Sequence, residues 1–239
     1  MNISVISTAQ QAKDIDFHSH IAVVIDVLRA TSVITTALEN GARCVIPVRT
    51  VEEAQQLYEA SNPAQTFRGG ERHALKIEGF ELDNSPMNYQ RQVVEGKEII
   101  ITTTNGTQAI QSVQGADTIV LACLRNVRAV AEHLLKSNKD IVIVCAGTEG
   151  RFSLDDGLCA GGLLHLLKEK TTVESDDLGI LLERFFRDSA LDPIHALKDC
   201  FHVKRLLSLG FDDDVAFCLQ TSVSEVVPIV RDGKVMSAL

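Results

Sequence analysis

At 239 residues, with 45% hydrophobic and 23% charged residues, the chain has the size and composition of a globular protein with a substantial core. Disordered, collagen-like, coiled-coil and disulfide-stapled proteins are excluded, because each has a different composition. The formal net charge of -9 disfavours nucleic acids and anionic membranes as partners, since both require a basic surface. A small anionic substrate would need local cations, such as a few arginines or a divalent metal.

The chain also carries signals about its compartment. No basic segment precedes an apolar run near the start, and no run approaches the ~18 apolar residues of a membrane span. The six cysteines contain no Cys-x-x-Cys pair and mostly stand within apolar runs, as is typical of buried free thiols in a reducing compartment. We therefore expect a cytoplasmic protein without a membrane anchor.

The first elements in chain order are two strand–helix pairs. Residues 21–25 are a short β-rich apolar run, and residues 31–38 follow with helical spacing until an Asn-Gly pair ends the helix. Residues 44–48 predict the next strand. Thr50 is expected to cap the helix that follows, whose first turn is acidic.

The same order of elements returns about 76 positions later. Residues 98–101 predict a strand, Thr107 lies at the start of a helix, and residues 118–122 predict another strand. This self-similarity predicts an internal duplication. We expect an α/β protein with two similar βαβ-type halves, residues 1–90 and 91–239, in α/β/α layers around a mixed sheet.

The C-terminal part is expected to complete the second half. Residues 176–209 have a helical pattern and are interpreted as a structural cover. Residues 226–236 form a hairpin signal, because the Asp232-Gly233 pair supplies the positive φ angles of a tight turn. We expect this hairpin at an edge of the sheet.

Polar residues gather where the predicted strands end, which is where α/β sheets bind ligands. Asp26 directly follows the first of these strands, and Arg29, Thr31 and Ser32 stand at the start of the next helix, whose free N–H groups favour an anion. This segment predicts a phosphate site. The alternative is that the hydroxyls only cap the helix and Asp26 only stabilises the turn.

The equivalent turn of the second half is rich in hydroxyl and amide groups. These groups present many hydrogen-bond donors to an oxyanion without adding charge. Strand propensity and helix capping would explain the same composition. The candidate substrate-binding residues of this turn are Thr103, Thr104, Asn105, Gly106 and Thr107.

A third polar segment follows the apolar strand at residues 141–144. Gly147, Thr148 and Glu149 form a turn, and Asp155 and Asp156 open a helix of small residues. Three carboxylates near one loop repel each other unless they share a proton or a cation, and oxygen-rich sites suit Mg²⁺. The alternative is a solvated acidic loop with a capping Asp.

Two loop segments of the first half are candidates to close over a substrate. Glu71 and Arg72 follow a Gly-Gly turn, and Asn84 precedes a Ser-Pro pair. Arg72 is expected to act as a bidentate fork for an anion. The alternative is an ordinary surface loop.

Other chemistries find less support. Cys145 ends a strand, but no histidine stands beside it in sequence to activate a thiol nucleophile. His18 and His20 precede a strand and are interpreted as surface residues, because the rest of a zinc ligand set is missing.

Several of these motifs together resemble the 2-phosphosulfolactate phosphatase family over almost the whole chain. The resemblance rests on residues 24–32, 70–72, 84–86, 103–107 and 145–148. It implies a Mg²⁺-dependent phosphoric monoester hydrolase that converts (R)-2-phospho-3-sulfolactate and water into 3-sulfolactate and phosphate, a step of coenzyme M biosynthesis.

On this basis we expect carboxylates to hold Mg²⁺ and water and other polar groups to hold the substrate. The expected catalytic residues are Asp26, Arg29, Glu149 and Asp156, and the expected metal ligands are Asp26, Glu149, Asp155 and Asp156. Arg29, Asn105 and Thr107 are expected on the substrate's oxygens. Direct attack by metal-activated water is the favoured mechanism.

Two alternatives remain open, as does assembly into a homo-oligomer. One is a phosphatase of the haloacid dehalogenase type, acting through a phosphorylated Asp26 on another small phosphate ester. Leu28 disfavours it, because that mechanism places an acidic residue two positions after the nucleophile. The other alternative is a non-catalytic protein that binds anions through the same turns.

Overall fold

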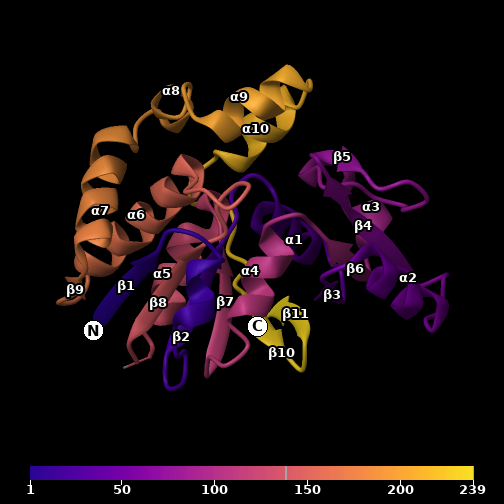
Figure 1. Ribbon diagram of the computed structural model, residues 1–239, viewed down its shortest axis with the longest axis horizontal. Helices are drawn as coiled ribbons and strands as arrows, with labels where there is room; N and C mark the ends of the chain where they lie inside the picture. Colours follow the sequence, from indigo (N-terminus) through magenta and orange to yellow (C-terminus); the bar gives the residue numbers. More distant parts are fainter. Residues whose placement is uncertain (138, 239) are drawn as a thin grey trace.

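The computed structural model describes residues 1–137 and 139–238, in which eleven strands form one mixed sheet (Figure 1). The strands are β1 (Asn2–Ile6), β2 (Ile21–Ile25), β3 (Cys44–Pro47), β4 (Thr66–Arg72), β5 (Leu75–Lys76), β6 (Glu98–Thr102), β7 (Thr118–Ala122), β8 (Ile141–Cys145), β9 (Glu174–Ser175), β10 (Pro228–Arg231) and β11 (Lys234–Ser237). Their order is β5-β4-β6-β3-β11-β10-β7-β2-β8-β1-β9. The expected α/β fold with a mixed sheet is confirmed.

Helices connect and cover these strands. They are α1 (Ala30–Glu39), α2 (Val51–Glu59), α3 (Arg91–Val94), α4 (Gly106–Ser112), α5 (Val127–Leu134), α6 (Leu154–Lys168), α7 (Asp177–Ser189), α8 (Pro193–Ala196), α9 (Phe201–Ser208) and α10 (Asp212–Cys218), with short 3₁₀ turns at Gln11–Asp14, Pro86–Asn88 and Leu124–Asn126. The predicted cap of α2 is confirmed, since the Thr50 side chain accepts a hydrogen bond from Glu53 N. It satisfies one of the helix's otherwise unpaired N–H groups.

The sheet consists of two parallel sets joined by an antiparallel hairpin. One set is β4-β6-β3, and the other is β7-β2-β8-β1-β9. Three antiparallel pairings, through β11 and β10, separate the two sets. Neighbouring strands twist by roughly 20–25°, so the five steps from β6 to β2 turn the strands by roughly 100–125°. The two sets run in opposite chain directions, and a twist of this size brings the carboxyl ends of β2 and β6 toward one region, where Gly106 lies against Asp26.

The chain crosses twice between the sets. The β2–α1–β3 unit starts in one set and ends in the other, and the β6–α4–β7 unit makes the reverse crossing. Strands from either side of residue 90 therefore pair with each other, β2 with β7 and β3 with β6. Common origin of the halves by duplication stays a prediction.

Helices on both faces give the sheet its layered core. In β2 every residue is buried, and alternate side chains enter two different clusters. Val23 and Ile25 pack with residues of α5 and α6, whereas Val24 packs with residues of α1 and α4. Burial on both faces explains why this strand reads as a continuous apolar run without alternation. On the other set, α2 packs against the outer face of β3 and β6.

One expectation for the C-terminal part was wrong. The hairpin at residues 228–237 lies in the middle of the sheet, with β10 on β7 and β11 on β3, and not at an edge. Its turn is as predicted, with positive φ at Asp232 and Gly233. The helical pattern over residues 176–209 is confirmed. It is divided into α7, α8 and α9, because Pro193 starts a new helix that Asp192 caps.

The expected state of the cysteines is confirmed. All six are buried free thiols. In the part of the chain that the structure describes, no helix combines the length and apolar character needed to cross a bilayer.

Candidate active site

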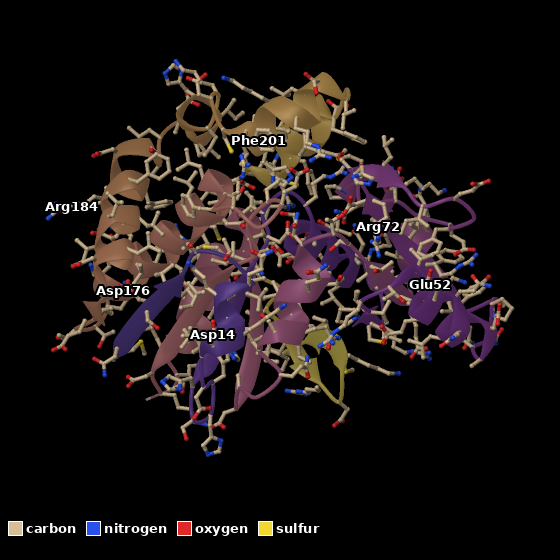
Figure 2. All side chains as sticks on the ribbon, viewed as in Figure 1. Asp14, Glu52, Arg72, Asp176, Arg184 and Phe201 are labelled. Carbon is tan, nitrogen blue, oxygen red and sulfur yellow. The ribbon has the colours of Figure 1, made fainter. Side chains whose placement is uncertain are left out.

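A pocket lies beyond the carboxyl ends of β2 and β6. Figure 2 shows polar side chains gathered between α9, where Phe201 is labelled, and the β4 region, where Arg72 is labelled. The lining residues are Asp26, Leu28, Arg29, Glu71, His73, Ala74, Asn84, Thr103, Thr104, Asn105, Thr148, Glu149, His202, Arg205 and Leu206. Segments that are far apart in sequence thus supply one concave, polar site.

The turns after β2 and β6 have matching internal hydrogen bonds. Thr31 Oγ1 accepts from Asp26 N at 3.1 Å and donates to Asp26 O at 2.8 Å. Thr107 Oγ1 does the same with Thr103, at 3.2 Å and 2.9 Å. Both threonine side chains are buried, so they hold the turns in shape and do not line the pocket.

The two turns approach each other at Gly106. A Cβ at this position would lie 2.4 Å from Ala30 Cβ and 2.6 Å from Asp26 Oδ2. These separations are far below van der Waals contact, so only glycine fits here. The close approach sets where the Asp26 carboxylate sits in the pocket.

Asp26 is the central carboxylate of the site. Its side chain is almost fully buried, and Ala30 N donates to Oδ1 at 3.3 Å. Burial raises the pKa of Asp26 to about 6; the nearby His202 opposes this shift, and Asp155 adds to it. The carboxyl group therefore changes charge close to neutral pH.

Two further aspartates lie behind the pocket wall. Asp156 accepts hydrogen bonds from Val27 N and Gly147 N, each at 2.9 Å, and so joins the loops after β2 and β8. Burial, together with the charges of Asp155 and Asp26, raises the pKa of Asp156 well above its ordinary value. Asp156 is therefore held as a structural link between the two loops.

Asp155 supports the lining residue His202. Its Oδ2 lies 3.5 Å from His202 Nδ1 and has no hydrogen-bond partner among the described residues, and its Oδ1 accepts from Ser153 Oγ. Burial would raise the pKa of Asp155, but His202 and Ser153 hold it below its ordinary value. Burial would likewise lower the pKa of His202, yet Asp155 raises it. The pair thus favours a protonated imidazole beside the pocket.

Two arginines reach the pocket from different sides. Arg29 donates to Asp214 Oδ2 at 2.6 Å and to Ala74 O at 2.9 Å, and its guanidinium stacks on the Phe211 ring. Asp214 also accepts from Ser85 Oγ at 2.6 Å. This network ties the loop after β2 to α10 and fixes the Arg29 fork.

The other pocket arginine, Arg205, comes from α9. It pairs with Glu149, which stands at a positive φ of 53° in the loop after β8. The side chains of this pair are 26% and 53% exposed, so the pair lies at the rim of the pocket.

The structure brings most of the expected site residues together. Those that line the pocket are Asp26, Arg29, Glu71, Asn84, Thr103, Thr104, Asn105, Thr148 and Glu149. Those that lie outside its lining are Thr31, Ser32, Arg72, Gly106, Thr107, Gly147, Asp155 and Asp156. Arg72 turns toward β6, where it donates to Thr102 Oγ1 at 2.9 Å, and toward Glu71 O at 2.7 Å.

Three site residues were not predicted from the sequence. His202 and Arg205 line the pocket, and Asp214 anchors Arg29. A signal was present in α9, where His202 and Arg205 stand three residues apart beside the buried Leu206. Residues at this spacing share a helix face, so polar side chains beside a buried leucine indicate a wet cavity within the cover.

Two carboxylates that face the pocket could serve as donors to a metal ion. Residues 1–137 and 139–238 hold no group of three or more His, Cys, Asp or Glu placed for a metal. Asp26 and Glu71 both line the pocket, and Glu71 is fixed by hydrogen bonds from Thr104 N and Ala74 N, each 2.7 Å long. Mg²⁺ commonly takes one or two carboxylates and completes its shell with water and substrate phosphate, so this donor pair fits it.

Comparison with known proteins gives one consistent result. The family model described as 2-phosphosulpholactate phosphatase matches residues 6–233. A protein of Caldanaerobacter subterraneus subsp. tengcongensis is 46% identical over 238 residues, which cover 100% of this chain and 99% of the relative. A protein of Clostridium botulinum strain Alaska E43 is 41% identical over 99% of both chains. Both relatives are named probable 2-phosphosulfolactate phosphatase.

Proposed function

Since the chain belongs to the 2-phosphosulpholactate phosphatase family, we propose that it hydrolyses (R)-2-phospho-3-sulfolactate to 3-sulfolactate and phosphate with the help of Mg²⁺. The proposal includes the cytoplasm as its compartment and coenzyme M biosynthesis as its pathway. Buried free thiols are in keeping with a reducing compartment.

The observation that carries the proposal is the surroundings of Asp26. Hydroxyl and amide groups of Thr103, Thr104 and Asn105 line the same pocket as this carboxylate and the Arg29 guanidinium. A phosphoryl group needs donors for its equatorial oxygens, which these side chains supply. Because Asp214 already fixes the Arg29 fork, little ordering remains when the phosphate binds.

Asp26 and Glu71 would hold Mg²⁺ at this site. When bound, Mg²⁺ neutralises phosphoryl charge and activates water. His202 holds a proton beside Asp26 and is suited to donate it from Nε2 to the leaving oxygen, because Asp155 lies at Nδ1. Attack of water on phosphorus then requires little further proton transfer, since the transition state is loose.

A covalent route through Asp26 is the second candidate. Leu28 cannot act as the acid of that route, but His202 lies near Asp26 and has an acidic proton to offer. His202 could therefore supply the proton that Leu28 cannot. Cys145 is a poor nucleophile, because burial raises the pKa of its thiol well above the ordinary value.

Phosphate release from phosphosulfolactate, with and without Mg²⁺, tests the proposal. We expect turnover that EDTA abolishes and that added Mg²⁺ restores. Undiminished activity in metal-free protein would exclude the metal, and binding of sulfolactate without any phosphate release would favour the non-catalytic alternative.

Acid quenching during a rapid single turnover separates the two routes. Direct hydrolysis leaves the protein unmodified by mass spectrometry, and Cys145→Ser keeps most of the activity. Stoichiometric phosphate on Asp26 would establish the covalent route instead.

A further inference from the structure

The pocket holds two guanidinium groups in very different settings. The Arg29–Asp214 pair has side-chain exposures of 2% and 4%, and its 2.6 Å hydrogen bond is shielded from water. The Arg205–Glu149 pair is exposed to 26% and 53% and is open to solvent. The two arginines must therefore respond differently when an anion enters.

The exposed pair is the one that a ligand can displace. An exposed ion pair contributes little, because water screens its attraction and two long side chains lose freedom. Removing one partner from a buried pair costs far more, since the other charge stays buried without compensation. An incoming anion can therefore replace Glu149 on Arg205 at small cost, while Asp214 stays on Arg29.

The pocket wall around Arg205 is formed by α9 and the loop after β8, which hydrogen bonds join. Thr148 Oγ1 lies 3.1 Å from His202 Nδ1 and 3.1 Å from Ser153 Oγ, which joins the loop after β8 to α9. Arg205 follows His202 by three residues on that helix, so both side chains lie on one face. The wall thus presents the Arg205 cation to the same pocket that the turn after β6 lines.

We propose that Arg205 binds the second anionic group of the substrate, the sulfonate or carboxylate that lies beside the phosphate ester, and that Glu149 occupies Arg205 until this group arrives. The inference rests on the proposed phosphatase function and deepens it. Arg205 is then a specificity-determining residue, because a phosphate ester without a second anion gains nothing from it.

Kinetics of Arg205→Gln with three phosphate esters test the inference. With phosphosulfolactate we expect KM to rise at least about 10-fold while kcat changes less, because a binding interaction is lost. With p-nitrophenyl phosphate, which has no second anion, kcat/KM should stay within about 2-fold of the parent. Phospholactate keeps the carboxylate and lacks the sulfonate, so it distinguishes the two groups. If Arg205→Gln has the parent's KM for phospholactate, Arg205 binds the sulfonate. If that KM is raised, Arg205 binds the carboxylate.

Lys204→Gln is the matched control, because it removes the same charge from the same helix outside the pocket, where Lys204 pairs with the exposed Asp199. Parent-like kinetics are expected for it with all three esters. Equal losses with every ester in Arg205→Gln, or no loss at all, would overturn the inference.

Glu149→Gln gives an independent readout. It frees Arg205, so KM for phosphosulfolactate should fall about 2- to 5-fold. A collapse of kcat with unchanged KM would instead make Glu149 a metal ligand and would contradict its role as a displaceable partner.

Calorimetric titration with 3-sulfolactate keeps this inference separate from the proposed reaction. A parent protein that releases no phosphate refutes the proposed function. Even then, the affinity of Arg205→Gln for 3-sulfolactate should be at least about 10-fold lower than that of the parent. Equal affinities, or no binding by the parent, would refute the inference.

Discussion

At the scale of single residues, the charged carboxylate of Asp26 lowers the stability of the folded protein. The ordinary pKa of 3.8 rises to about 6 because the carboxyl is buried near Asp155 and receives few hydrogen bonds. The folded state thus binds this proton more tightly than the unfolded chain does. The contribution of protonated Asp26 to the free energy of unfolding is fully present below about pH 4 and is lost as the pH rises through about 6.

Asp26→Asn should therefore be inactive yet more stable than the parent at pH 7. The uncharged amide avoids the buried charge, and a shift of about two pKa units predicts a gain on the order of 1–3 kcal/mol in the free energy of unfolding. Urea denaturation in EDTA at pH 4 and at pH 7 measures this gain, which should grow with pH.

The exposed Asp188→Asn is the control and should stay within about 0.5 kcal/mol of the parent at both pH values. A less stable Asp26→Asn protein at pH 7 would show that Asp26 stabilises the fold as a carboxylate.

At the scale of elements, the site depends on how closely the turns before α1 and α4 approach each other. Each turn is closed by its own threonine, through hydrogen bonds that span only four or five residues. Gly106 then removes the Cβ that would separate them. The local sequence of each turn fixes its shape, and the contact between turns fixes the position of Asp26.

Gly106→Ala should displace Asp26 and reduce kcat/KM at least about 10-fold, because catalysis depends on the position of the reacting groups. The backbone cannot give way cheaply, since Ala30 belongs to a fully buried helix start. Steady-state kinetics measure the loss of kcat/KM, and the thermal midpoint measures the cost to stability.

Gly115→Ala is the control for this variant. A Cβ at Gly115 meets no heavy atom of the described residues within 4 Å, so activity and stability should be unchanged. Parent-like kinetics in Gly106→Ala would mean that the turns adapt and that their close approach does not set the site.

At the scale of the whole molecule, the C-terminal hairpin makes one sheet out of two parallel sets. Val235 in β11 is fully buried and pairs with Val45 in β3, while Ile229 in β10 pairs with Val120 in β7. The last two strands of the chain thus connect β3 and β7, which stand much earlier in the sequence. We expect the two sets to unfold together.

Val235→Ala should lower the free energy of unfolding by about 2 kcal/mol, through lost apolar contact and a small cavity. Val223→Ala, at a position that is 53% exposed, should stay within about 0.5 kcal/mol of the parent.

Urea unfolding followed by two probes tests whether the sets unfold together. Tyr58 and Tyr89 report on the set around β6, and far-UV circular dichroism is dominated by long helices such as α6 and α7 on the other set. Both probes should give one midpoint in the parent and in Val235→Ala. Separate midpoints would show that the hairpin does not couple the sets.

Much of the local structure followed from the sequence alone. The apolar run at 21–25, the cap at Thr50 and the positive-φ turn at Asp232-Gly233 were predicted, because each depends on neighbours within a few residues. The same holds for the positions of Asp26 and Thr103 at strand ends, which places both at the pocket.

Only the tertiary structure decided which distant residues meet. Nothing near Arg29 in sequence points to Asp214, and nothing near Asp26 points to His202. His202 arrives on a helix predicted as a mere cover, and Asp214 arrives on α10, which lies beyond the predicted cover. The hairpin was placed at an edge for the same reason, because an alternating pattern predicts pairing without naming the partner strand. Short-range sterics and hydrogen bonding thus determine turns, caps and strands, whereas the packing of the whole chain determines which charges share a pocket.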